Sequence, residues 1–130
     1  MIVTDASAMV EVLLRLPGAE SVEARMFRPG VTLHAPHLLD VEVAQVVRRL
    51  VTTGKIDHRE GRDAINDLAD MPIKRYPHDV LLKRIWALRG NLSAYDAAYV
   101  ALAEALDAPL LTRDRRLANA AGLYASIQVV

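Results

Sequence analysis

The chain has 130 residues, of which 52% are hydrophobic and 25% charged, and its 16 basic residues balance its 16 acidic ones. This composition predicts one globular domain over residues 1–130 and argues against a disordered chain. The lack of cysteine excludes disulfides, thiolate metal sites and a cysteine nucleophile. No basic segment followed by an apolar stretch opens the chain, and the apolar run near its middle, 97–103, is far too short to span a bilayer. We therefore expect a cytoplasmic protein with no membrane contact.

Short apolar runs alternate with longer segments of helical periodicity along the chain. We expect strands at 1–4, 31–34, 73–76, 109–112 and 124–130. We expect helices at 6–16, 19–27, 37–51, 58–70, 80–89, 93–104 and 115–121. Because strands so far apart in sequence need crossover connections, this order predicts an α/β fold whose sheet is mostly parallel, has four to five strands and is covered on both faces.

The helix expected at 80–89 has apolar residues at helical spacing. It should turn Leu81, Leu82, Ile85 and Trp86 inward, with Trp86 in the core. No glycine-rich phosphate-binding loop follows any predicted strand, so a dinucleotide or P-loop site is not expected.

Two aspartates, Asp5 and Asp114, stand where a predicted strand ends and a predicted helix begins. Ligands of open parallel sheets bind beyond the carboxyl ends of the strands, which favours a functional site here. Aspartate is also a favoured helix N-cap, and for either residue alone the two interpretations stand equal. Asp96 has a similar alternative, because Ser93 three residues earlier completes a capping box.

Glu42 is the acid that helix capping does not explain. It lies in the second turn of its predicted helix between two valines, where an unpaired, buried glutamate would be costly. A position at the rim of the fold, or a salt bridge to Arg49, would also account for it. Asp40 lies about 200° around the helix from Glu42, so both cannot point into one site, and we leave Asp40 out.

We therefore hypothesise that these four acids meet in space and hold a divalent metal. Carboxylate oxygens are ligands that Mg²⁺ and Mn²⁺ prefer. Without a metal, carboxylates so close together repel one another, so the arrangement makes little sense as scaffolding. The hydroxyls of Ser7 and Thr112 stand beside two of the acids, where they would either orient metal-bound water or substrate, or only satisfy the backbone.

Four segments surround the acids: Thr-Asp-Ala-Ser at 4–7, Ala-Pro-His-Leu-Leu-Asp-Val-Glu at 35–42, Tyr-Asp-Ala-Ala-Tyr-Val-Ala-Leu-Ala at 95–103 and Leu-Leu-Thr-Arg-Asp at 110–114. Together they resemble the PIN-domain family, and within it the VapC-type toxins of bacterial toxin–antitoxin pairs. The resemblance covers essentially the whole chain. Any one segment alone would be a weak signal, but all four in order and at family-like spacing are specific.

This resemblance implies a three-layer α/β/α fold and an endoribonuclease that depends on one or two Mg²⁺ or Mn²⁺ ions. It also implies a toxin that acts on RNA to inhibit translation and growth, a cognate antitoxin encoded alongside it, and often a homodimer. By position, Asp5, Glu42, Asp96 and Asp114 match the acidic quartet of the family. Some members carry a further acid soon after the last one, whereas positions 115–117 here hold two arginines and a leucine, which leaves a second metal site open.

The hypothesis gives the acids two kinds of role. Asp5, Asp96 and Asp114 would ligate one metal. Glu42 would hold that metal through water or help to activate the attacking water. By the family resemblance, the products would carry a 5′-phosphate and a 3′-hydroxyl.

Arg113, Arg115 and Arg116 flank the last acid and would contact substrate phosphates, although the solvated start of a helix explains them equally well. The alternative function is a non-catalytic PIN scaffold that binds RNA or a protein partner. A phosphatase with Asp5 as nucleophile is disfavoured, because Ser7 stands where such an enzyme would carry a second aspartate. The RNA target and the antitoxin-binding surface do not follow from the sequence.

Overall fold

A parallel β-sheet forms the centre of the computed structural model, which describes residues 1–120 and 122–130. Its strands are β1 (Ile2–Thr4), β2 (Leu33–Pro36), β3 (Ile73–Tyr76), β4 (Leu110–Thr112) and β5 (Ile127–Val129). They pair in the order β3-β2-β1-β4-β5, and all four pairings are parallel. The predicted parallel sheet is therefore confirmed, with β1 at its centre between β2 and β4.

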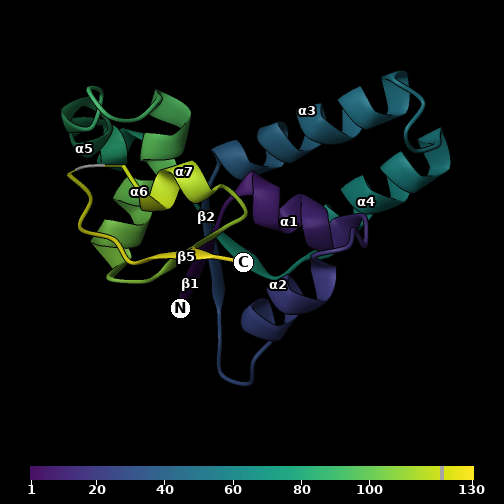
Figure 1. The fold of residues 1–130 in the computed structure, drawn as a ribbon, viewed down its shortest axis with the longest axis horizontal. Coiled ribbons are helices and arrows are strands. Elements are labelled where there is room, and N and C mark those ends of the chain that lie inside the picture. Colours follow the sequence, from purple (N-terminus) through teal and green to yellow (C-terminus); the bar gives the residue numbers. More distant parts are fainter. Residues whose placement is uncertain (121) are drawn as a thin grey trace.

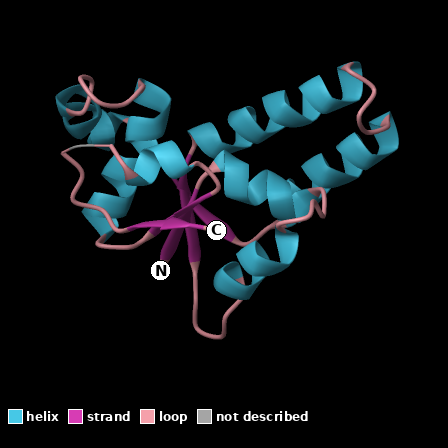
Figure 2. Cartoon of the chain, in the orientation of Figure 1, coloured by secondary structure: helices cyan, strands magenta, loops and turns pink. Residues whose placement is uncertain are grey.

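Helices cover both faces of this sheet. They are α1 (Ala6–Leu13), α2 (Ala19–Met26), α3 (Leu38–Thr52), α4 (His58–Asp70), the 3₁₀ turn η1 (Asp79–Leu81), α5 (Leu82–Ala87), α6 (Ala94–Leu106) and α7 (Arg115–Ala118). Figure 1 shows the sheet between α5 and α6 on one side and α1 and α3 on the other, and Figure 2 shows the same layers by secondary structure. This arrangement confirms the predicted three-layer fold. The hairpin of α3 and α4 extends well beyond the sheet (Figure 1).

Strand β2 begins two residues later than the sequence predicts. The N–H of Val31 donates to the carbonyl of Arg28, which ties Val31 into the turn that precedes the strand. Gly30 in this turn has φ +83°, a conformation that favours glycine. The strand instead continues to Pro36, which is tolerated because it is the last residue to pair. Strand β5 is likewise shorter than predicted. The helix predicted at 115–121 ends at Ala118, and its last predicted residue lies outside the described residues.

The prediction that Trp86 lies in the core is wrong, as is the prediction that Leu82 points inward. Trp86 is 68% exposed and Leu82 is 58% exposed. The helix predicted at 80–89 divides into η1 and the six-residue α5, which has no fully buried residue among those described. Leu81 and Leu88 fill the core on either side of α5. The guanidinium of Arg89 lies over the Trp86 ring at 4.6 Å from its centroid, which partly covers the exposed indole.

Small residues let α6 lie close to the centre of the sheet. Ala97, Ala98, Ala101 and Ala103 are buried, and α6 contacts β1, β2 and β4. This packing brings the first turn of α6 to the edge of the sheet where β1 and β4 end. In the part of the chain that the structure describes, none of the helices has the length and apolar character needed to cross a membrane.

Candidate active site

Asp5 both caps a helix and faces the other acids. It follows β1 and is the N-cap of α1, where one carboxylate oxygen accepts hydrogen bonds from the Ala8 N–H at 3.0 Å and the Ser7 hydroxyl at 2.7 Å. The other oxygen accepts a short hydrogen bond from the Thr112 hydroxyl. Burial raises the pKa of Asp5, the three hydrogen bonds lower it, and the charge of Asp96 raises it further. Asp5 can therefore be both a helix N-cap and a residue of the functional site.

The hydroxyls of Ser7 and Thr112 join the end of β1 to the end of β4. Thr112 accepts from the Asp114 N–H at 3.0 Å, and Ser7 accepts from the Arg113 N–H at 2.9 Å. Both hydroxyls also donate to Asp5. They hold Asp5 in place and satisfy the backbone of the strand end, which is one of the two roles expected of them.

Glu42 reaches the site from the second turn of α3. Its carboxylate accepts a short hydrogen bond from the hydroxyl of Tyr99 on α6, in place of the salt bridge to Arg49 considered above. Burial raises the pKa of Glu42, the Tyr99 hydrogen bond lowers it, and the charges of Asp96 and Asp5 raise it further. Asp40 on the same helix forms a bidentate pair with an arginine of β3, which agrees with leaving it out of the site.

Tyr99 is a site residue that reasoning from the sequence missed. It is almost fully buried, and a buried tyrosine hydroxyl normally finds a hydrogen-bond partner. Burial and the contact with Glu42 raise the pKa of Tyr99, so its hydroxyl remains a donor. The available signal was its position three residues after Asp96, on the same face of an alanine-rich helix.

Asp96 lies in the first turn of α6. The Ser93 hydroxyl accepts the Asp96 N–H at 3.2 Å, so the predicted N-cap is confirmed. The carboxylate of Asp96 nevertheless faces a cavity of about 410 Å³. Burial and the charge of Asp114 raise the pKa of Asp96, and the charge of Arg116 lowers it. The cap is provided by the Ser93 hydroxyl and uses only the backbone N–H of Asp96, which leaves the Asp96 carboxylate for the cavity.

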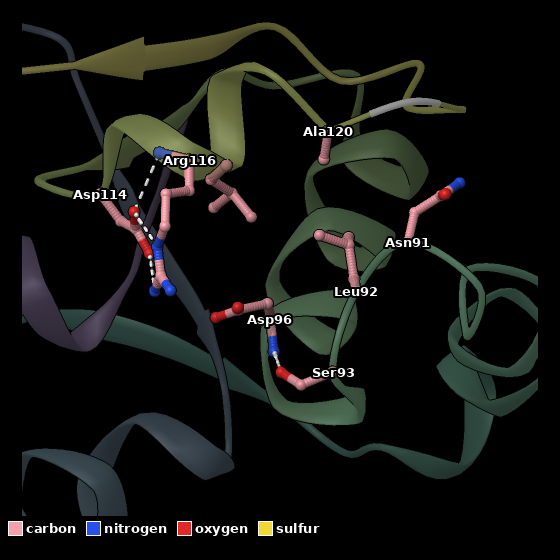
Figure 3. Close-up of a pocket in the computed structure, with 8 residues that line it drawn as sticks. Asn91, Leu92, Ser93, Asp96, Asp114, Arg116 and Ala120 are labelled. Atoms are coloured by element: carbon pink, nitrogen blue, oxygen red, sulfur yellow. Dashed lines mark hydrogen bonds and ion pairs between the residues drawn. The ribbon is translucent and has the colours of Figure 1, made fainter.

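Asp114 is the N-cap of α7 and lines the same cavity. One of its oxygens accepts from the backbone N–H of Arg116 at 2.9 Å, and both accept from the Arg116 guanidinium, at 3.1 and 2.8 Å. The hydrogen bond from the Arg116 side chain lowers the pKa of Asp114. Figure 3 shows Asp96 pointing from α6 toward the side of the cavity where Asp114 and Arg116 pair.

All four acids therefore gather where β1 and β4 end, each from a different element. The charge of Asp96 acts on Asp5 and Glu42, and the charge of Asp114 acts on Asp96. An all-oxygen donor set of this kind suits a hard divalent cation. Within residues 1–120 and 122–130, however, no three acidic or histidine side chains converge closely enough to form a complete set of metal ligands. The donor chemistry therefore fits such a cation. We call the four carboxylates an open ligand set, because no three of them converge on one point in the described residues.

Comparison with protein families matches the PIN domain over residues 2–123. This chain belongs to the PIN-domain family. It is 43% identical to ribonuclease VapC9 of Mycobacterium tuberculosis over 130 residues, which cover 100% of this chain and 98% of that relative. The match places this PIN domain among the VapC ribonucleases and confirms the family predicted from the four sequence segments.

Solved structures share the fold of this PIN domain. VapC20 of Mycobacterium tuberculosis, a sarcin–ricin loop cleaving toxin, superposes with a TM-score of 0.73 at 13% identity, over 95% of this chain and 96% of its own. VapBC2 from Rickettsia felis, bound to a DNA fragment from their promoter, gives a TM-score of 0.71 at 13% identity over 99% and 98%. At such identities, the likeness shows the fold alone.

The three arginines of this PIN domain that were expected near substrate have different settings. Arg113 turns away from the cavity, because its guanidinium pairs with Glu11 of α1 at 3.0 Å and donates to the Val130 carbonyl. Its predicted contact with substrate is therefore not supported by its position. Arg115 is exposed at the start of α7. Arg116 alone of the three lines the cavity with the acids.

Proposed function

We propose that this VapC ribonuclease is a metal-dependent endoribonuclease that acts as the toxin of a toxin–antitoxin pair. The observation that carries the proposal is the gathering of Asp5, Glu42, Asp96 and Asp114 at the ends of β1 and β4. Four carboxylates with a single arginine among them are electrostatically unfavourable without a cation. Identity of 43% to VapC9 over the whole chain supports RNA as the substrate.

Asp5, Asp96 and Asp114 would hold Mg²⁺ or Mn²⁺, and Glu42 would assist through water. When bound, such an ion would supply positive charge that polarises a phosphate oxygen and makes an attacking water more acidic. Ser7 and Thr112 are not proposed as ligands, because their hydroxyls already donate to Asp5. One ion is the minimum, and a second remains a prediction of the family resemblance.

Glu42 is the residue best placed to accept a proton from the attacking water. Its carboxylate is half-buried, and burial together with two neighbouring acids raises its pKa toward the range useful for a general base. Tyr99 donates to one oxygen of Glu42 and so orients the other. Asp96 and Asp5 would remain ionised beside the cation.

We also propose a cognate antitoxin as the protein partner and the cytoplasm as the site of action. The relation to VapC9 and the fold shared with VapBC2 support the partner. A homodimer is proposed as well, with its interface at an apolar patch around the pocket that the exposed Leu82 and Tyr95 line together, where the exposed Trp86 stands four residues after Leu82 on α5. Replacing Trp86 with glutamate should halve the mass measured by light scattering if this patch joins two copies. An unchanged mass would refute that interface.

A non-catalytic scaffold that binds RNA or protein is the second candidate. The observation in its favour is the open ligand set, since no three described carboxylates converge completely.

Metal binding and RNA cleavage distinguish the two candidates. We would titrate Mn²⁺ into the protein by calorimetry and follow cleavage of total RNA in parallel. The wild type should bind Mn²⁺ and cleave, Asp96→Asn should do neither, and Asp67→Asn should match the wild type. Asp67 is a suitable control because it is an exposed acid on α4, a helix that carries none of the four acids. A wild-type protein that neither binds Mn²⁺ nor cleaves RNA would favour the scaffold.

A further inference from the structure

One arginine, Arg116, lies among the acids that line the cavity, and its guanidinium pairs with the carboxylate of Asp114. The Arg116 guanidinium contacts each oxygen of Asp114, and its own backbone N–H adds a third hydrogen bond to the same carboxylate. Asp114 thereby has three donors directed at it. Arg116 also lines the cavity with Asp96, and Figure 3 shows the Arg116 side chain on the side of Asp114 toward which Asp96 points. A positive side chain therefore stands where a cation ligated by both aspartates would have to approach.

This pairing is readily broken. The Arg116 side chain is 89% exposed, against 29% for Asp114. Exposed ion pairs are weak, because water and salt screen them and because the long side chain loses freedom when it is held. A divalent cation carries twice the charge of a guanidinium and binds carboxylates at shorter range. The cation would therefore compete successfully for Asp114.

We propose that Arg116 is a latch on Asp114. In the metal-free protein, the Arg116 guanidinium pairs with the Asp114 carboxylate. When a divalent cation binds, the guanidinium leaves Asp114 and contacts a phosphate of the substrate instead. The inference rests on the proposed metal site and adds to it a residue that opposes metal binding. It accounts for the open ligand set, because Asp114 faces Arg116 in place of the other acids. It also gives the released guanidinium a use, because its forked donors match a phosphate group.

The test compares two neighbouring arginines. Arg116→Gln removes the latch, and Arg115→Gln removes the same charge one residue away, from an exposed side chain that does not line the cavity. By calorimetry, Arg116→Gln should bind Mn²⁺ about three- to fivefold more tightly than the wild type, because an exposed ion pair contributes up to about 1 kcal/mol. Arg115→Gln should change the affinity by no more than about twofold, because a screened surface charge acts weakly.

A second measurement separates the latch from a general electrostatic effect. At saturating Mn²⁺, Arg116→Gln should cleave total RNA about tenfold more slowly than the wild type, because the phosphate contact is lost. Metal affinity and cleavage rate would then move in opposite directions. Circular dichroism and thermal melting should show that both variants keep the wild-type fold.

Each outcome bears on the proposal. Equal Mn²⁺ affinity of Arg116→Gln and the wild type would overturn the latch and leave the proposed metal site intact. An equal gain in Arg115→Gln would also overturn it, because only net charge would then matter. A wild type that binds no Mn²⁺ beside an Arg116→Gln variant that does would support a strong latch. If neither protein binds Mn²⁺, the proposed metal site fails and the latch fails with it.

Discussion

Replacing Tyr99 with phenylalanine removes one hydroxyl from the contact between α6 and Glu42 on α3. The ring stays in the core, so no large cavity forms, and the loss is confined to the hydrogen bond that Tyr99 donates to Glu42. That bond favours the ionised carboxylate and lowers the pKa of Glu42, against the burial that raises it. The substitution therefore raises this pKa further.

The size of the effect follows from the burial of the two partners. A hydrogen bond to a charged group contributes about 1.5–3 kcal/mol when buried. Tyr99 is buried but Glu42 is only half-buried, so water replaces part of the lost donor, and we expect a loss of about 1–1.5 kcal/mol in the free energy of unfolding at pH 7. The loss should shrink as pH falls through the pKa of Glu42, because a neutral carboxyl accepts a weaker hydrogen bond.

Urea denaturation between pH 4 and about 8 measures the stability change, and the pH dependence of RNA cleavage measures the effect on Glu42. The acidic limb of the cleavage profile should move to higher pH in Tyr99→Phe. Tyr95→Phe is the matched control, since Tyr95 is on the same helix but is exposed. An unmoved acidic limb with a full loss of stability would refute the role of Glu42 as the base. An unchanged stability would refute the hydrogen bond itself.

Three further changes test the site and the packing. Asp96→Asn should raise the free energy of unfolding of the metal-free protein by up to about 1 kcal/mol at pH 7. The pKa of Asp96 is raised in the folded protein by burial and by the charge of Asp114. The gain in stability should therefore be absent below pH 3.8, the pKa of the unfolded state, and should grow as pH rises through the pKa of the folded state. A variant less stable than the wild type at pH 7 would contradict this expectation. Gly61→Ala places a Cβ 2.7 Å from a valine methyl of α3 and should cost about 1–2 kcal/mol in urea denaturation, whereas Gly90→Ala, with no atom within 4 Å of its Cβ, should cost little. Trp86→Ala should cost less than about 1 kcal/mol and Leu88→Ala about 2–5 kcal/mol, and equal costs would show that Trp86 is packed after all.

Local signals in the sequence were sufficient to place the backbone of the acids. Asp5 and Asp114 were predicted at strand ends that precede helices, and Ser93 was predicted to cap the helix that carries Asp96. Such signals act over three or four residues, so they survive in any tertiary context that keeps the element. The parallel sheet followed in the same way, because widely spaced strands require crossovers.

Exposure of the helix at 80–89 was not determined by local periodicity. A helical repeat of apolar residues predicts one buried face, but the length of a helix and its position at the edge of the fold decide how much of that face is covered. The six-residue α5 leaves Trp86 in solvent, where Arg89 covers its ring.

The sequence by itself determined which elements carry the acids, and that Asp5 and Asp114 follow strands at the carboxyl edge of a parallel sheet. Only the tertiary structure decided their partners: Tyr99 for Glu42, 57 residues apart, and Thr112 for Asp5, 107 residues apart. It also decided that Arg113 turns to Glu11 while Arg116 stays among the acids. The physical reason is the range of the interactions, since caps and strand ends depend on adjacent residues, whereas hydrogen bonds between side chains depend on how distant elements pack.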